Sequence, residues 1–185
     1  MLDFILKTTA PVDVVNVTRL MVTNFIAITS LIIIFTKVEN RYRVENSATP
    51  SIVYDRDSLR YFKTFRIILT AAAAAEAAVF VWHGNNFQIR LIGIALFFSG
   101  LLLRIGAIKT LGKYWSFHVV RYVDQPLVRT GIYRFISHPA YFGNIYLIGI
   151  YLAFGAIFTA LVATVLVTWF GIYRVRLERI NNLCE

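Results

Sequence analysis

Long apolar runs, separated by short polar stretches, dominate the hydropathy pattern of the chain. A helix needs roughly 20 apolar residues to cross a bilayer. The runs of about this length are Leu20–Phe35, Phe65–Trp82 and Ile89–Ile108. A further run, Tyr141–Tyr173, is too long for one span, and the segment Phe154–Ala156 near its middle predicts a tight hairpin between two helices. The pattern therefore predicts five spans.

Composition places the chain among integral membrane proteins. Hydrophobic residues make up 58% of the chain and aromatic residues 15%, whereas a typical soluble domain is about half apolar. Backbone groups in lipid must find hydrogen-bond partners within their own segment, so each span is expected to be an α-helix. The sequence predicts an all-α polytopic membrane protein whose last two helices form a hairpin.

The distribution of basic residues predicts the orientation of the chain. The formal net charge is +9, which would also be compatible with nucleic-acid binding. In a five-span arrangement, however, only Lys7, Arg19 and Arg90 fall on one side of the membrane. Because positively charged loops stay in the cytosol, we expect the N-terminus outside or in a lumen, and a cytosolic face that attracts anionic lipids. A bacterial inner membrane or the endoplasmic reticulum would suit this arrangement, with no nucleic-acid partner.

Several other classes of protein lack support in the sequence. The segment before the first span contains Asp3 and has no basic start, so it does not resemble a signal peptide. The single cysteine, Cys184, excludes a disulfide framework and a cysteine-based metal site. No glycine-rich nucleotide loop is present, and the three histidines are too scattered for a histidine-rich metal centre. We therefore expect no metal.

The N-terminal half contains two charged features, a polar stretch to which we assign no chemistry and a single glutamate within a span. Val38–Leu59 mixes acidic and basic residues, which is typical of a cytosolic connector. Glu76 follows a run of alanines in the second span, and small residues favour close packing of membrane helices. An ionisable group within a span is a functional candidate by default, but this one lies toward the outer end. We expect it to make a structural hydrogen bond or to approach Arg90, with a direct role as the alternative.

The polar passage between the third and fourth apolar runs carries the richest chemistry. It reads QPLVRTGIYRFISHPAY from Gln125 to Tyr141 and combines a histidine, a proline, a glycine and two tyrosines. On the last predicted helix, Arg174 and Glu178 are four residues apart and so project from one helix face. Since both regions fall on the predicted cytosolic side, we expect these side chains to face one cavity.

A fixed spacing of residues runs through this passage and the span before it. Its members are Arg104, Ala107, Leu111, Gly112, Leu127, Val128, Gly131, Tyr133, His138, Pro139, Tyr141 and Gly143. With Arg174 and Glu178, this spacing resembles the isoprenylcysteine carboxyl methyltransferase (ICMT) family, whose core reads approximately R-x-x-A-x-x-x-L-G, then H-x-L-V-x-x-G-x-Y-x-x-x-R-H-P-x-Y-x-G. The resemblance divides the chain into an N-terminal two-span region, residues 1–86, and an ICMT-like catalytic core, residues 87–185.

The resemblance implies an S-adenosyl-L-methionine-dependent methyltransferase, similar to protein-S-isoprenylcysteine O-methyltransferases. It implies that a lipophilic substrate enters sideways from the bilayer and is methylated on a carboxyl group at the cytosolic face. Arg174 would face the substrate carboxylate and Glu178 would hold the cofactor. The other positions implied to contact the cofactor are His118, Gln125, Pro126, Leu127, Val128, Tyr133, His138, Pro139, Ala140 and Tyr141.

Elementary chemistry agrees with these roles. A carboxylate is already ionised near pH 7, so its methylation needs no general base. Holding two reactants in attack geometry can supply roughly 7–11 kcal/mol of the barrier, and an arginine can bind a carboxylate through two parallel hydrogen bonds. Pro139 is suited to the first position of a helix, where free backbone amides could hold the carboxylate of the cofactor.

Three positions depart from the family pattern, and other functions stay open. Gln125 replaces a histidine, Ser137 replaces an arginine, and Arg179 stands where a second glutamate is common. A phospholipid N-methyltransferase would share the architecture and cofactor but would need a base to deprotonate its amine. An NADPH-dependent membrane reductase and a non-catalytic homologue are the remaining alternatives.

Overall fold

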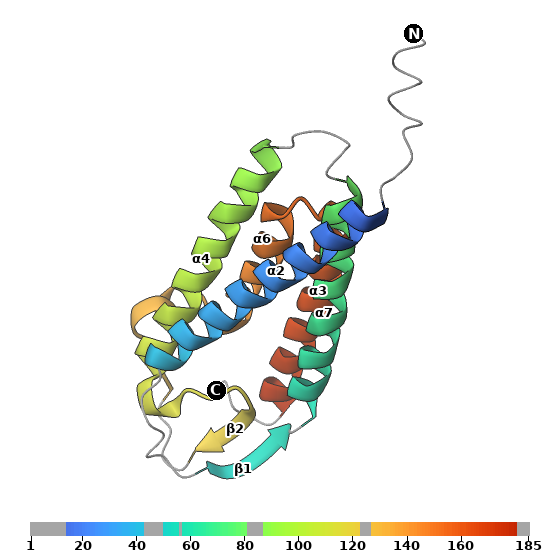
Figure 1. Cartoon of the computed structure of the whole chain (residues 1–185). Coiled ribbons are helices and arrows are strands. Elements are labelled where there is room, and N and C mark those ends of the chain that lie inside the picture. Colours follow the sequence, from blue (N-terminus) through green and yellow to red (C-terminus); the bar gives the residue numbers. More distant parts are fainter. Residues whose placement is uncertain (1–13, 43–49, 56, 81–86, 123–126, 181–185) are drawn as a thin grey trace.

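The computed structural model describes residues 14–42, 50–55, 57–80, 87–122 and 127–180 of the 185-residue chain. These residues form a helical bundle (Figure 1). Its main helices are α2 (Val14–Tyr42), α3 (Ser58–Phe80), α4 (Phe87–Leu111), α6 (Ile145–Ala153) and α7 (Ile157–Ile180). The smaller elements are β1 (Pro50–Asp55), η2 (Gly112–Tyr114), β2 (Val119–Tyr122), η3 (Gly131–Arg134) and α5 (Pro139–Phe142). The predicted helical fold is confirmed.

The membrane character of the chain is supported by three helices in its described part. α2, α7 and the segment Phe87–Tyr114 are each long and apolar enough to cross a bilayer. α3 has 23 residues and packs against α2 and α7, but it carries Lys63, Arg66 and Glu76. α6 has only nine residues. The count of five spans therefore stays a prediction.

The hairpin predicted within the last apolar run is confirmed at its expected place. α6 ends at Ala153 and α7 begins at Ile157. Between them, Gly155 has a φ of +81°, a conformation that glycine adopts without steric penalty, and its N–H donates to the Leu152 carbonyl at 2.9 Å. The two arms are unequal, because a turn at Gly143 separates the short α5 from α6, whereas α7 is continuous over 24 residues.

Glycines let α4 and α6 pack backbone against backbone. A Cβ atom added to Gly149 would lie 2.4 Å from the Phe97 nitrogen, and one added to Gly93 would lie 2.4 Å from the Ala153 nitrogen. Gly100 faces α6 equally closely, with 2.6 Å from its ideal Cβ position to a backbone nitrogen. Small residues allow membrane helices to approach in this way, and here they fix the position of α6 against α4.

Glu76 caps the start of α7. Its Oε1 accepts a hydrogen bond from the Phe158 N–H at 2.7 Å. Its Oε2 accepts from the N–H and the hydroxyl of Thr159 at 2.8 and 2.7 Å. The first amides of a helix lack intrahelical acceptors, and negative charge is favourable there. The expected structural hydrogen bond is confirmed, with α7 and not Arg90 as the partner.

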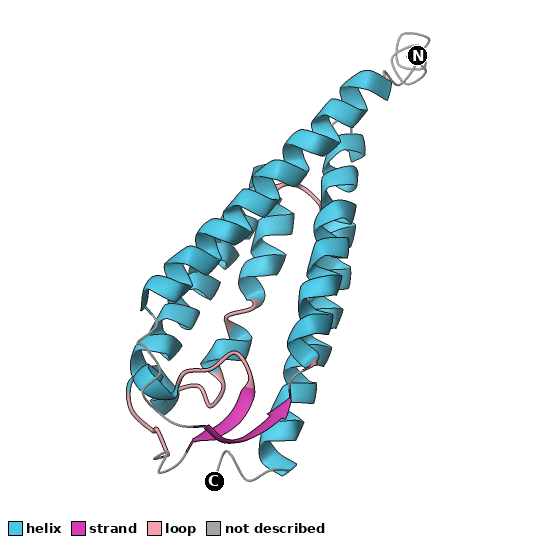
Figure 2. Cartoon of the chain, turned by 60° about the horizontal axis from the view of Figure 1, so that its bottom comes forward, coloured by secondary structure: helices cyan, strands magenta, loops and turns pink. Residues whose placement is uncertain are grey.

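A two-stranded antiparallel sheet crosses one end of the bundle (Figure 2). β1 pairs with β2, with Val53 opposite Val120. The polar stretch predicted as a connector is therefore partly structured: α2 continues to Tyr42, and β1 follows before α3 begins at Ser58. The sheet ties the N-terminal region to the segment after α4, at the end of the bundle where α7 finishes (Figure 1).

Candidate functional site

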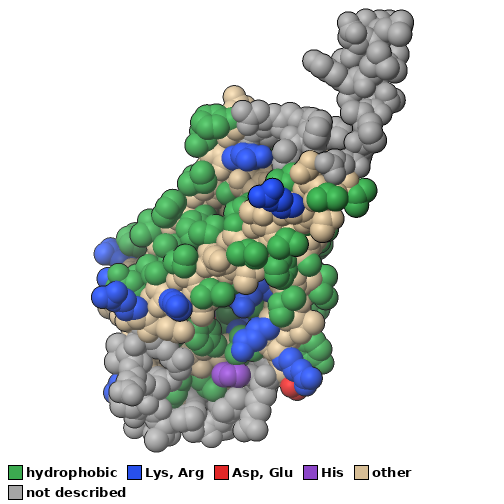
Figure 3. Space-filling model, in the orientation of Figure 1, with side chains coloured by type: hydrophobic (Ala, Val, Ile, Leu, Met, Phe, Trp, Pro, Cys, Tyr) green, Lys and Arg blue, Asp and Glu red, His purple; other side chains and the backbone are tan. Residues whose placement is uncertain are grey.

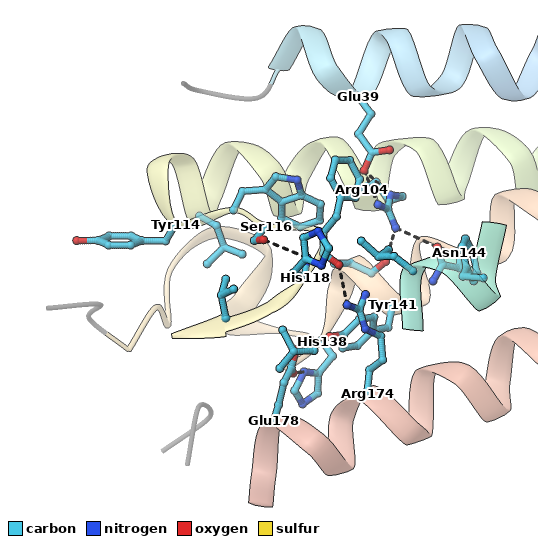
Figure 4. A pocket seen from close by; sticks show the side chains of 18 of the residues that line it. Glu39, Arg104, Tyr114, Ser116, His118, His138, Tyr141, Asn144, Arg174 and Glu178 are labelled. Carbon is cyan, nitrogen blue, oxygen red and sulfur yellow. Dashed lines mark hydrogen bonds and ion pairs between the residues drawn. The ribbon is translucent and has the colours of Figure 1, made fainter. Parts of the chain in front are cut away.

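A cavity of about 970 Å³ lies at the sheet end of the bundle, near the upper end of the usual size range of ligand sites. Side chains from α2, α3, α4, α7 and the loops between α4 and α6 line it. Figure 4 shows charged side chains from α2, α4 and α7 on the walls of one space. Both the N-terminal region and the core therefore build the cavity.

Most of the predicted site residues meet at this cavity. Its lining includes Arg174, His118, Leu127, Val128, Tyr133, His138, Ala140, Tyr141 and Glu178. Pro139 is buried and begins α5 without lining the cavity itself. Gln125 and Pro126 lie outside the described residues. The roles of all these residues toward a cofactor or a substrate stay predictions.

Two residues of the predicted motif hold the Glu178 carboxylate. The Tyr141 hydroxyl donates to its Oε1, and His138 Nδ1 lies 3.3 Å from its Oε2. The His138 and Tyr141 rings stack with their centroids 5.9 Å apart. Hydrogen bonds to an ionised group are short and strong, so this contact orients the carboxylate of α7 against α5 (Figure 4).

Part of the backbone at the start of α5 is hydrogen-bonded within the segment itself. The N–H groups of Tyr141 and Phe142 both donate to the His138 carbonyl, at 3.1 and 3.3 Å. α5 has only four residues, and a helix this short closes on its own first carbonyl. The amides of Tyr141 and Phe142 are thus already bonded, and the prediction that the start of this helix holds the cofactor carboxylate stays a prediction.

Tyr133, on η3, faces the same carboxylate. Burial raises the pKa of its hydroxyl above the ordinary value, the charge of Glu178 raises that pKa further, and Arg104 partly opposes the rise. The hydroxyl therefore stays protonated at neutral pH and can act as a hydrogen-bond donor. η3 begins at Gly131, which has a φ of +56°. A Cβ there would lie 2.7 Å from Thr110 Oγ1, so glycine is required for this approach.

A backbone carbonyl and two aromatic rings help to hold Arg174 in the cavity wall. The side chain is buried, and its Nη2 donates a hydrogen bond to the Phe117 carbonyl at 2.7 Å. Its Cζ lies 5.4 Å from the centre of the Phe170 ring and 5.9 Å from that of Tyr141. Tyr141 thus contacts both Arg174 and Glu178, and the two charged residues line one cavity, as their four-residue spacing predicted.

Comparison with known proteins identifies the family of the chain. The model of the isoprenylcysteine carboxyl methyltransferase (ICMT) family matches residues 91–183, half of the chain. The protein belongs to this family. The match covers most of α4, all of α7 and the polar passage between them. The predicted resemblance is confirmed, and membership implies an S-adenosylmethionine-dependent methyltransferase. Searches of curated proteins and of solved structures gave no significant match.

A buried ion pair that was not predicted from the sequence joins α2, outside the family match, to α4. Arg104 Nε donates to Glu39 Oε1 at 2.8 Å, and Nη2 donates to the same oxygen. Arg104 Nη1 donates to the Ala140 carbonyl at 3.1 Å and to Asn144 Oδ1 at 3.0 Å (Figure 4). This network connects α2 directly to the wall that contains His138 and Tyr141.

A sequence signal for Glu39 existed but was weak. The buried residues of α2 are Ile28, Ile32, Phe35 and Glu39. Their spacing of four, three and four residues follows one helix face, so continuing the apolar stripe by one step would have placed Glu39 inside the bundle. The residue was instead assigned to the polar connector because it follows the end of the apolar run.

One glycine of the ICMT pattern makes room for this ion pair. A Cβ on Gly143 would lie 2.2 Å from Arg104 Cγ, so only glycine lets the arginine stem pass between α4 and the turn after α5. The arginine and this glycine of the family pattern therefore serve a single arrangement, in which Arg104 reaches the carbonyl of Ala140.

Proposed function

We propose that the protein is an S-adenosylmethionine-dependent carboxyl methyltransferase that acts on a lipophilic, isoprenylcysteine-like acceptor at the cytosolic membrane face. The observation that carries the proposal is the meeting of Arg174, Glu178, His138 and Tyr141 in one cavity within the region matched by the ICMT family. Arg174 supplies a cation for the acceptor carboxylate, and Glu178 supplies an anion for the cofactor.

The residues present suit this cofactor. Glu178 would accept hydrogen bonds from its amino group or its ribose, while Tyr141 and His138 keep the carboxylate oriented. When bound, S-adenosylmethionine supplies a methyl group from a positively charged sulfur, and transfer to an ionised carboxylate needs no general base. The contribution of the chain is to orient both partners and to exclude water.

The charge of the cavity favours an anionic acceptor. Its basic lining residues are Lys63, Arg66, Arg104, Arg129, Arg134 and Arg174, and its carboxylates are Glu39 and Glu178. A site lined mainly by one sign of charge concentrates ligands of the opposite sign. Such a cavity attracts a carboxylate and repels the amine of a phospholipid N-methyltransferase substrate.

The carboxylates offer no evident base for amine methylation either. Glu39 is paired with Arg104, and Glu178 accepts a hydrogen bond from Tyr141. Glu76, the remaining carboxylate on α3 within the apolar run, caps α7 and does not line the cavity. Carboxyl methylation is therefore better supported than N-methylation.

We infer that the acceptor reaches the cavity from the bilayer. α2, α4 and α7 are long and apolar enough to span a membrane, and the cavity lies at one end of the bundle (Figure 2). The positive-inside rule assigns this end, which carries most of the basic residues, to the cytosol. Membrane lipids are thus the proposed surroundings, in a bacterial inner membrane or the endoplasmic reticulum.

Binding of S-adenosylhomocysteine to detergent-purified protein tests the proposal. We expect a dissociation constant in the submillimolar range, loss of binding in Glu178→Ala, and retained binding in Arg174→Ala. Arg174→Ala should instead lower methylation of N-acetyl-S-farnesyl-L-cysteine. Arg176→Ala is the matched control, because Arg176 is exposed on the same helix and does not line the cavity.

Two results would contradict the proposal. If the wild-type protein binds neither S-adenosylhomocysteine nor S-adenosylmethionine below 1 mM, on the order of the weakest useful affinity, it is not a methyltransferase of this kind. If Glu178→Ala and Arg174→Ala both match Arg176→Ala in binding and turnover, the site assignment is wrong. Circular dichroism of each variant checks that the helices remain folded.

A further inference from the structure

Arg66 lies on the inner face of α3. The residues that share this face are Phe62, Arg66, Leu69, Thr70, Ala73 and Ala77, and they are spaced as one helical stripe. Leu69, Thr70, Ala73 and Ala77 are buried, and Phe62 and Arg66 line the cavity. Ile67 and Ile68, on the other side of α3, are 63% and 62% exposed. Arg66 is therefore the one charged member of this inward stripe.

No carboxylate among the described residues forms an ion pair with Arg66. Its charge lies near the Tyr146 hydroxyl, a neutral group. Glu39, which also lines the cavity, is already paired with Arg104. An ionisable residue that faces the interior of a membrane bundle is unfavourable unless it is paired, and such residues mark ligand sites and pathways.

Arg66 and Arg174 lie on either side of a stacked aromatic pair. The Phe62 ring on α3 stacks on the Phe170 ring on α7, with 4.8 Å between centroids. Each arginine follows its phenylalanine by four residues, and the two helices run in opposite directions (Figure 1). Their Cα atoms are therefore separated along the bundle by the rise of about eight helical residues, roughly 12 Å.

The side-chain directions bring the two guanidinium groups closer than this. Side chains lean toward the N-terminus of their helix, so Arg66 and Arg174 both lean toward the level of the aromatic pair. The 5.4 Å between Arg174 Cζ and the Phe170 ring shows this for α7. Lys63, one turn before Arg66, also lines the cavity and is exposed. Figure 3 shows Lys and Arg side chains gathered in the hollow below α2.

We propose that Arg66, with Lys63 at the cavity mouth, forms a second anion subsite, and that the acceptor is an amphiphile with a second carboxylate or phosphate group besides the carboxylate bound by Arg174. This inference rests on the proposed function, because it concerns the acceptor of the same cavity. Arg174 holds the group that is methylated. Arg66 holds the second group. This anionic group balances the charge of Arg66, for which the described residues provide no carboxylate partner.

Paired probes that differ by one carboxylate test the subsite. We compare N-acetyl-S-farnesyl-L-cysteine with N-succinyl-S-farnesyl-L-cysteine, measuring equilibrium binding to protein in phosphatidylcholine nanodiscs. The wild type should bind the N-succinyl probe about tenfold more tightly, the gain expected of one charge-assisted contact. Arg66→Gln should reduce this preference to within about twofold, whereas Arg66→Lys should keep part of it.

Two controls separate the subsite from other effects. Arg60→Gln removes a basic side chain from the exposed face of the same helix, outside the cavity lining, and should keep the full preference. Arg174→Gln should weaken both probes equally. S-adenosylhomocysteine binding should be unchanged in Arg66→Gln. If the wild type failed to bind S-adenosylhomocysteine, the proposed function would be contradicted. The ratio of the affinities for the two probes would still report on the subsite.

Three outcomes would overturn the subsite. In the first, the wild type binds both probes equally. In the second, Arg66→Gln weakens both probes to the same extent, which would assign Arg66 to the methylated carboxylate or to the fold. In the third, phosphatidylglycerol added to the nanodiscs removes the preference, which would assign Arg66 to a phospholipid of the bilayer and not to the acceptor.

Discussion

The two walls of the cavity are built in different ways. The wall within the ICMT match is joined by close backbone contact: Gly93 and Gly149 bring α4 and α6 together, and a tight hairpin places α7 beside α6. The N-terminal wall, α2 and α3, reaches this core through charged side chains. Glu39 binds Arg104 on α4, and Glu76 binds the start of α7.

This difference follows the boundary of the family match. Glycine spacing and turn residues form a local pattern, and the family model matches the region that contains them. The charged contacts of α2 and α3 each depend on a single residue outside residues 91–183. Arg66 belongs to the same N-terminal wall but has no carboxylate partner among the described residues. The N-terminal wall is therefore where we expect acceptor selectivity to arise.

The largest effect should come from breaking the ion pair between the walls. Glu39→Gln leaves Arg104 buried without its counter-charge, since the two side chains are only 6% and 11% exposed. Loss of one partner from a buried pair typically destabilises a protein by about 3–5 kcal/mol. We expect a clear fall in the apparent melting temperature and weaker S-adenosylhomocysteine binding, because Arg104 also supports the Ala140 carbonyl.

Lys37→Gln is the matched control for this prediction, because Lys37 is an exposed charged residue on the same helix. It should leave both measurements unchanged. Equal melting temperatures for Glu39→Gln and Lys37→Gln would show that the position of α2 does not depend on this contact. The N-terminal wall would then not be held to the core by the Glu39–Arg104 ion pair.

A smaller effect should follow from separating α4 and α6 within the core wall. Gly149→Ala places a Cβ 2.4 Å from the Phe97 nitrogen and 2.7 Å from the Gly93 oxygen, so the helices must move apart. Overpacking of this kind costs about 1–3 kcal/mol. Gly106→Ala on α4 meets only the Ile132 side chain, at 3.4 Å, and should be tolerated. Thermal unfolding in detergent compares the two, and equal stability would argue against backbone packing here.

The smallest of these effects should come from the cap on α7. In the wild type, the two carboxylate oxygens of Glu76 accept hydrogen bonds from Phe158 and Thr159. Glu76→Gln keeps one acceptor oxygen but loses the second acceptor and the negative charge. Loss of a helix cap destabilises by about 1 kcal/mol. Because Glu76 does not line the cavity, S-adenosylhomocysteine binding should not change. A loss of binding without loss of stability would instead give Glu76 a direct role.

The sequence predicted the parts of this molecule that depend on local patterns. The apolar run from Tyr141 to Tyr173 and its central glycine predicted the hairpin, and Gly155 adopts the expected turn. The four-residue spacing of Arg174 and Glu178 predicted that they share one helix face, and both line the cavity. Neither prediction requires knowledge of what packs against the helix.

Contacts between distant segments were predicted less well. Glu39 was placed in a connector, although α2 extends past it to Tyr42, because a polar residue after an apolar run carries no sign of a partner 65 residues later. The strands β1 and β2 were missed for the same reason, since each is short and is stable only when paired with the other.

The sequence alone determined a helical membrane fold, the hairpin, and a set of residues typical of the ICMT family. Hydropathy and residue spacing are local properties. In a bilayer, an apolar segment forms a helix because the helix provides hydrogen-bond partners for its own backbone groups. Only the tertiary structure decided that α2 and α3 complete the cavity, that Glu39 neutralises Arg104, and that Arg66 lacks a carboxylate partner among the described residues. The partner of a buried charge depends on how the helices pack, because several segments of the chain could each provide a counter-charge for the same side chain.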